Sequence, residues 1–211
     1  MSLSDNSNLW LAETLFRLGA IEFGDFTLGR TAVGSPVYVN PRKIIGHPTA
    51  LAHAAEVISD EIRTLQNMRN PGVHKFDLVA GVPLGGLHIA TAYSLCADVP
   101  MIYMHPGREE AAVEGVYTPG ETAIIMDDLV TGGGSIAETA EAMREAGLMV
   151  HDAFVLIDRQ QGARERLRRE GINLRSALTL EVLLNFLRYN DLIEEDWHRK
   201  SIAYLHESGS V

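Results

Sequence analysis

The chain has 211 residues, of which 46% are hydrophobic and 22% charged, a composition typical of a globular protein with a substantial core. Its 28 acidic residues outnumber its 18 lysines and arginines, and this net charge of -10 offers no broad basic surface for nucleic acid. No segment approaches the roughly 20 apolar residues of a membrane span, and the first ten residues lack the pattern of a secretory leader. We therefore expect one cytoplasmic domain spanning residues 1–211, which binds neither nucleic acid nor membrane.

The first third of the chain contains two predicted helices with a predicted strand pair between them. Apolar residues recur at helical spacing from Leu11 to Leu18. The runs 21–28 and 36–40 are rich in β-branched and aromatic residues and are separated by a turn with two glycines, which predicts a strand pair. Residues 48–66 form a long amphipathic pattern that predicts the second helix.

From residue 76 onward, apolar strand-like runs alternate with helical patterns. The predicted strands are 76–82, 100–104, 122–128 and 149–158, and the predicted helices are 86–97 and 135–147. This alternation favours an α/β fold with a mostly parallel sheet covered on both faces. Such sheets bind ligands at the carboxyl ends of their strands, where the loops 81–86, 127–135 and 158–162 would lie.

The single cysteine, Cys96, can close no internal disulfide. It falls in the apolar run 87–99, which suits a packed thiol better than a nucleophile. We therefore expect no catalytic role for Cys96.

The loop after the predicted strand 122–128 has the character of a phosphate site. Three consecutive glycines, 132–134, stand between the hydroxyl side chains of Thr131 and Ser135 and open directly onto a helix. Glycine is common in turns, so the triplet alone indicates little. In this context, however, backbone N–H groups, hydroxyls and the positive end of a helix dipole converge on one point, as a terminal phosphate requires.

Two nucleotide motifs can be compared with this spacing. A Walker phosphate loop needs a lysine that this loop does not contain. Gly132, Gly134 and Ala137 match a loose dinucleotide fingerprint, with acids downstream at Asp152 and Asp158. Asp152 lies near the start of its predicted strand, away from any ribose at the carboxyl end, and Asp158 comes late. The fingerprint is a weak alternative that leaves the acids ahead of the glycines unexplained.

Those acids, Asp127 and Asp128, would repel a lone phosphate in the same loop. A ribose 5-phosphate resolves the conflict, because its phosphate can occupy the glycine loop while its 2- and 3-hydroxyls donate to the two carboxylates. Carboxylates also suit Mg²⁺, which prefers oxygen ligands and retains several waters. A solvated strand end or a helix cap is the alternative for an isolated acid pair, and the adjoining glycine loop favours the ribose phosphate.

The run 125–135 resembles the phosphoribosyl-pyrophosphate motif of type I phosphoribosyltransferases. Further runs are similar to the orotate phosphoribosyltransferase family, and together they cover about residues 19–187 in the expected order. These runs are 23–28, 35–40 followed by Arg42, 81–86, 119–128 and 154–167.

The resemblance implies the type I phosphoribosyltransferase fold, with a mostly parallel central sheet flanked by helices. It implies a small N-terminal hood at about 1–45 and a core at about 46–187, which leaves a helical tail at about 188–211. For the tail we expect a surface helix anchored by Trp197 and Tyr204. A homodimer is also implied, because the family's catalytic loop works across a subunit interface.

The implied activity is transfer of ribose 5-phosphate from phosphoribosyl pyrophosphate to orotate, with Mg²⁺ held mainly by substrate and water near Asp127 and Asp128. Thr131 and Arg159 match the family's orotate contacts, and a guanidinium fork suits the orotate carboxylate. The positions that match the phosphoribosyl-pyrophosphate contacts are Asp127, Asp128, Leu129, Val130, Thr131, Gly132, Gly133, Gly134, Ser135, Gly81, Val82, Pro83, Leu84, Gly85, Gly86 and Arg30.

The chain departs from the family at the catalytic loop. Residues 104–115 are shorter than the family loop and lack its lysines, which leaves His105 and Arg108 as positive catalytic candidates beside Asp127 and Asp128. A family lysine after residue 28 is also missing, and Arg30 stands there as a substitute. Two alternatives stay open: a non-catalytic sensor of phosphoribosyl pyrophosphate or a nucleotide, and a transferase for another base.

Overall fold

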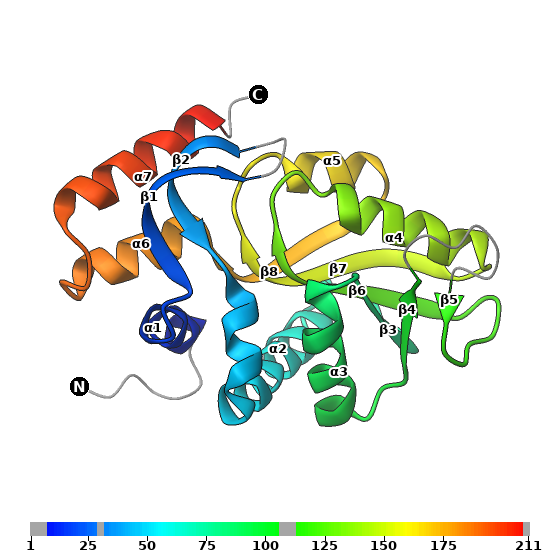
Figure 1. Cartoon of the computed structure of the whole chain (residues 1–211). Helices are drawn as coiled ribbons and strands as arrows, with labels where there is room; N and C mark the ends of the chain where they lie inside the picture. The colour runs from blue at the N-terminus through cyan, green and yellow to red at the C-terminus, as the bar shows by residue number, and fades with distance from the viewer. Residues whose placement is uncertain (1–7, 29–31, 106–112, 209–211) are drawn as a thin grey trace.

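The computed structural model describes residues 8–28, 32–105 and 113–208, and this part of the chain is built around a six-stranded sheet (Figure 1). All neighbouring strands are parallel except β5, which pairs antiparallel with β4 at one edge. In spatial order the strands are β5 (Val113–Glu114), β4 (Met101–Met104), β3 (Leu78–Gly81), β6 (Thr122–Val130), β7 (Met149–Asp158) and β8 (Asn173–Thr179). The predicted α/β class with a mostly parallel sheet is confirmed.

Helices cover both faces of this sheet, so its central strands are apolar on both sides. Figure 1 shows α4 (Gly134–Glu145) and α5 (Ala163–Arg169) over one face, and α2 (Pro48–Gln66) and α3 (Gly85–Ala97) over the other. Each face has its own cluster of buried side chains. Among the described residues, no helix is both long and apolar enough to cross a bilayer.

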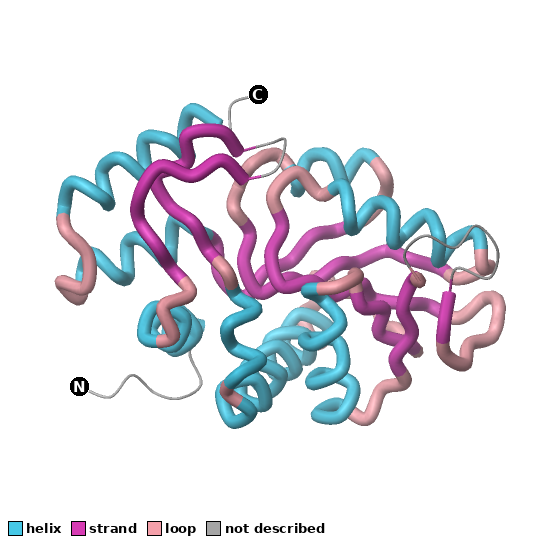
Figure 2. Tube along the Cα trace, viewed as in Figure 1, coloured by secondary structure: helices cyan, strands magenta, loops and turns pink. Residues whose placement is uncertain are grey.

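A second, two-stranded sheet stands apart from the main one, as the tube in Figure 2 shows. Its strands β1 (Ile21–Leu28) and β2 (Ala32–Val39) pair antiparallel, with Phe23 opposite Val37 and Phe26 opposite Ser35. The surrounding helices are α1 (Asn8–Arg17), the 3₁₀ helix η1 (Pro41–Gly46), α6 (Leu180–Tyr189) and α7 (Glu195–Ser208). This hairpin is the small N-terminal sheet that the sequence predicts, whereas the expected boundaries at residues 45 and 187 stay a prediction.

The structure corrects two details of the sequence interpretation. The predicted loop 127–135 begins too early, because β6 continues to Val130, which pairs with Asp158 of β7. The helix expected in the tail is α7, which is held in place where the Trp197 ring packs against Phe23 with centroids 5.9 Å apart. Cys96 is exposed, so the expectation of a packed thiol is wrong: α3 is apolar all round, but only one side of it meets the core.

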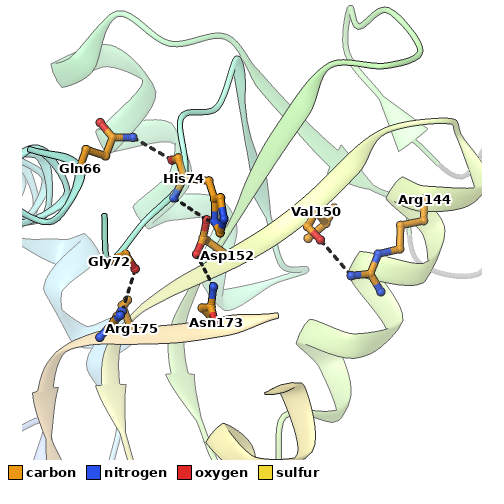
Figure 3. Close-up of polar contacts among 8 residues, drawn as sticks. All are labelled: Gln66, Gly72, His74, Arg144, Val150, Asp152, Asn173 and Arg175. Carbon is orange, nitrogen blue, oxygen red and sulfur yellow. Dashed lines mark hydrogen bonds and ion pairs between the residues drawn. The ribbon is translucent and has the colours of Figure 1, made fainter. Parts of the chain in front are cut away.

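A polar cluster joins the amino ends of β7 and β8 to the loop between α2 and β3 (Figure 3). Asp152 is buried and accepts hydrogen bonds from the backbone N–H of His74 at 2.8 Å and from Nδ2 of Asn173 at 3.2 Å. Nearby, Nε of Arg175 donates to the carbonyl oxygen of Gly72 at 3.0 Å. Asp152 therefore serves the structure at the end of the sheet opposite the strand carboxyl ends, which argues against the dinucleotide alternative.

Candidate active site

Three predicted ligand loops meet at the carboxyl edge of the main sheet. The strands β3 and β6 are adjacent, and the backbone N–H of Val82, just after β3, donates to the carbonyl oxygen of Met126 at 3.0 Å. On the other side of β6, the backbone N–H of Arg159 donates to the carbonyl oxygen of Val130 at 3.0 Å. The loops after β3, β6 and β7 are therefore neighbours, as the parallel arrangement predicts.

The acid pair lies near the end of the central strand β6. Asp127 is 7% exposed, and its Oδ1 accepts a hydrogen bond from the backbone N–H of Asp128 at 2.9 Å. Oδ2 of Asp128 lies 3.6 Å from Nε of Arg42, which follows the hairpin. Burial raises the pKa of Asp127 well above its ordinary value, and the Asp128 carboxylate raises it further, while the Asp128 backbone N–H and Arg42 oppose the shift. This pair favours a partner that donates hydrogen bonds or carries positive charge.

The loop after β3 packs so tightly against these acids that it requires glycine. A Cβ atom at Gly85 would overlap the Asp128 carboxylate, and one at Gly86 would overlap the carbonyl oxygen of Met126. The peptide bond between Pro83 and Leu84, immediately before, is cis. The run 81–86 thus brings backbone, rather than side chains, against the acid pair.

The glycine loop after β6 leads into α4 without a side-chain cap. Gly133 has φ of +79°, and a Cβ atom there would lie 3.1 Å from Cγ of Leu167, so glycine is required for both backbone and packing reasons. A Cβ atom at Gly132 would meet no atom within 4 Å, because that position is open. The first N–H groups of α4 have no helical partner and therefore form a natural anion site.

Arg159 is 2% exposed, whereas an isolated arginine after a strand would ordinarily lie at the surface. Its Nη2 donates to Oγ of Ser35 at 3.1 Å and lies 3.5 Å from the carbonyl oxygen of Val37, both on β2. Burial lowers the pKa of Arg159, and the hydroxyl of Tyr204 on α7 acts in the opposite direction. Thr131, its predicted companion, begins the glycine loop next to Val130.

The basic residues expected to cover the pyrophosphate can be placed only in part. His105 directly follows β4 and is half-buried. Arg30 and Arg108 lie outside the described residues, so their predicted roles stay predictions. Arg42 is the cation beside Asp128, a contact that sequence analysis missed although Arg42 follows a recognised run.

Ser35 and Tyr204 were also missed as parts of the site. Ser35 stood within one of the runs that carried the resemblance, and Tyr204 was expected only as a packing anchor. Neither residue has a local sequence signal that connects it to Arg159, because the contacts form between segments far apart in the chain.

Comparison with known proteins identifies relatives along most of the chain, although no protein-family model matches it. The orotate phosphoribosyltransferase of Caenorhabditis elegans is 37% identical over 201 residues, which make up 92% of this chain and 83% of that protein. The solved orotate phosphoribosyltransferase of Aeropyrum pernix has 33% identity and a TM-score of 0.71, covering 84% of this chain and 99% of its own. The UMP synthase of Leishmania donovani has 32% identity and a TM-score of 0.85, covering 96% of this chain but only 43% of its own.

The similarity extends over both the main sheet and the surrounding helices rather than over one motif. An independent line of evidence is the arrangement of acids and glycine loops at one sheet edge, which matches the order of motifs in the sequence. With a relative 37% identical over 83% of that relative's length, the chain belongs to the orotate phosphoribosyltransferase family of type I phosphoribosyltransferases.

Proposed function

We propose that the protein transfers ribose 5-phosphate from phosphoribosyl pyrophosphate to N1 of orotate, giving orotidine 5′-phosphate and pyrophosphate in pyrimidine nucleotide synthesis. The observation that carries this proposal is the acid pair Asp127 and Asp128 set between two glycine loops at the same sheet edge. Acids that accept from ribose hydroxyls and N–H groups that bind a phosphate suit a phosphorylated ribose.

In the proposed reaction, the bond between C1 of the ribose and pyrophosphate breaks and its electron pair leaves with pyrophosphate. N1 of orotate forms the new bond to C1 while its proton passes to solvent. Because the sugar becomes oxocarbenium-like, the main requirements are orientation and charge stabilisation. Asp127 and Asp128 would hold the 2- and 3-hydroxyls and favour the cationic sugar.

The two phosphate groups would bind on either side of the acid pair. The 5-phosphate would lie in the run 131–135 against the first N–H groups of α4. The pyrophosphate would lie against 81–86, where glycines bring the backbone close to β6. This division assigns each glycine loop one phosphate group, and it leaves the carboxylates to the ribose between them.

Mg²⁺ fits this donor set as an ion held mainly by substrate and water. The described residues contain no group of three or more His, Cys, Asp or Glu side chains that could enclose a metal. Two adjacent carboxylates nevertheless offer the hard oxygen ligands that Mg²⁺ prefers. When bound there, Mg²⁺ would supply positive charge that neutralises the departing pyrophosphate.

Arg159 and Thr131 would select the acceptor. A buried guanidinium makes strong, directional hydrogen bonds to a carboxylate, which orotate carries and uracil lacks. Arg159 stands immediately after β7, next to the end of β6, so this selectivity would act beside the glycine loop. We propose orotate over another base on this ground.

The proposal also includes the catalytic loop 104–115 and a homodimer. His105, Arg108 and Arg30 would supply positive charge to the pyrophosphate, with the loop acting across a homodimer interface. The exposed Leu84 and Leu95, at the start and near the end of α3, are apolar side chains that a second copy of the chain would cover. A cytoplasmic location stays a prediction.

The test is a turnover assay with orotate, phosphoribosyl pyrophosphate and Mg²⁺, following loss of orotate absorbance together with pyrophosphate release. We expect turnover that stops on chelation of Mg²⁺ and is lost in Arg159→Ala. Arg169→Ala, on the exposed side of α5, is the matched control and should behave as wild type. Binding of phosphoribosyl pyrophosphate without turnover would favour the sensor, and turnover only with another base would favour a different transferase.

A further inference from the structure

Arg159 is a buried cation without a carboxylate partner among the described residues. Removing a guanidinium from water is costly unless other groups satisfy its donors. Its Nη2 is held by the hairpin, but its Nε is buried and has no hydrogen-bond partner in the described structure. An unsatisfied donor on a rigidly held guanidinium is a position for a ligand's acceptor atom.

Ser35 is oriented to accept from this guanidinium. Its hydroxyl is 0% exposed and donates its only proton to the carbonyl oxygen of Val37 at 2.8 Å. The lone pairs of Oγ therefore accept, from Nη2 of Arg159 at 3.1 Å and from the backbone N–H of Val37 at 3.4 Å. Because Ser35 lies on β2 opposite Phe26, the hairpin fixes where this acceptor stands.

Tyr204, on α7, contacts the loop that carries Arg159 from a different part of the chain. Nε2 of Gln161, two residues after Arg159 in the loop after β7, donates to the Tyr204 hydroxyl at 3.5 Å. The helix that carries it is fixed against the hairpin by Trp197 on Phe23 and by the buried Leu205. Hairpin, loop and C-terminal helix thus converge on one side chain.

We propose that Ser35, by its hydrogen bond to Arg159, and Tyr204, by its hydrogen bond to Gln161 in the same loop, are positioning residues that hold the Arg159 guanidinium with its Nε side turned to the carboxylate of the acceptor base. This makes α7 part of the acceptor site, although α7 lies beyond the main sheet in sequence. The inference rests on the proposed function, since it assigns the means by which that same site selects a base bearing a carboxylate.

The experiment measures kcat and KM for both substrates in Ser35→Ala and Tyr204→Phe. We expect KM for orotate to rise about tenfold in Ser35→Ala, which loses a hydrogen bond to a charged group. We expect a rise of about threefold in Tyr204→Phe, which loses a hydrogen bond between neutral groups. The values of kcat and of KM for phosphoribosyl pyrophosphate should stay within about twofold of wild type, because Ser35 bonds to Val37 and Arg159, and Tyr204 to Gln161, on the acceptor side of the acid pair.

Two matched controls separate positioning from general loosening of the fold. Ser201→Ala removes a fully buried hydroxyl of α7 that has no hydrogen-bond partner, and Tyr189→Phe removes an exposed hydroxyl of α6. Both controls should retain the wild-type KM for orotate. Thermal unfolding of all four variants identifies any that fold poorly, and calorimetric binding of orotate then replaces kinetics for that variant.

The outcomes distinguish the inference from the proposed function. Wild-type turnover of orotate with an unchanged orotate KM in both variants would overturn the inference and leave the function standing. Equal rises in both KM values would also overturn it, because a merely structural role would affect both substrates. If the wild-type protein neither binds nor consumes orotate, the function and the inference both fail.

Discussion

Replacing Gly86 by alanine tests how closely the loop after β3 must approach the acid pair. The added Cβ would overlap the carbonyl oxygen of Met126 and lie 2.9 Å from Cα of Asp127. Both obstacles are backbone atoms of the central strand β6, so the first turn of α3 must move away. Overpacking of this kind costs about 1–3 kcal/mol, and the higher helix propensity of alanine offsets roughly 1 kcal/mol. A net loss of about 1 kcal/mol lowers Tm by about 2–4 °C in a chain of this size.

The displaced loop should also bind pyrophosphate less well, so KM for phosphoribosyl pyrophosphate should rise together with the fall in Tm. Thermal unfolding followed by circular dichroism gives the first quantity, and steady-state kinetics give the second. Gly132→Ala is the control, because its Cβ would meet no atom within 4 Å and its φ is not in the left-handed region. Its Tm should equal or exceed that of wild type. Wild-type Tm and KM in Gly86→Ala would refute the reasoning.

Three further predictions concern other parts of the molecule. Asp127→Asn should raise the free energy of unfolding by about 1 kcal/mol at pH 8 and lower kcat at least about tenfold. Because the pKa of Asp127 is raised in the folded protein, the wild type loses stability as pH rises through that folded-state pKa. The stability gained by Asp127→Asn should therefore shrink in acid, and urea titrations at several pH values would measure this change. Asp152→Ala should cost about 2–4 kcal/mol in the same titration yet leave both KM values unchanged, because its hydrogen bonds lie at the opposite end of the sheet. Trp197→Ala should cost about 2 kcal/mol by removing the contact with Phe23, and calorimetric binding should show weaker orotate affinity.

The main sheet could be predicted because its strands are buried on both faces. The runs that form β3, β6 and β7 are nearly continuous apolar segments, and each is followed by a glycine-rich or polar loop. Parallel strands place all such loops at one edge, so the neighbourhood of the three loops followed from chain order alone. The helix over 48–66 was equally clear from its periodicity and has the predicted bounds.

Two of the segments that were missed, β8 and α5, have weaker local patterns. The edge strand β8 contains Asn173, Arg175 and Ser176 among its seven residues, and α5 is a seven-residue helix rich in arginine. Both are specified by the surfaces they pack against rather than by their own periodicity. Cys96 shows the converse, since an apolar neighbourhood in sequence does not reveal which side of α3 meets the core.

Some parts of the candidate site are contiguous in the sequence, whereas others form only through contacts between distant residues. The acid pair and the glycine loops are contiguous motifs, so their chemistry could be inferred from spacing. The contact between Ser35 and Arg159 joins residues 124 positions apart, and the approach of Tyr204 depends on how α7 folds back over the hairpin. Long-range convergence of this kind has no periodic signature, because it depends on how the completed elements pack.

Asp127 and Arg159 are two energetically unfavourable charges at positions where groups of opposite charge would lie in the proposed reaction. Burial raises the pKa of Asp127 and lowers that of Arg159, so in each case the fold disfavours the ionised form. The proposed ligands relieve both costs: a cationic sugar and its hydroxyls satisfy Asp127, and a carboxylate satisfies the unpartnered Nε of Arg159. A site optimised for stability alone would remove both groups, and their presence together at this sheet edge favours a role in binding. The same reasoning explains why the hairpin and α7 matter, since a buried cation aids recognition only when neighbouring groups fix its direction.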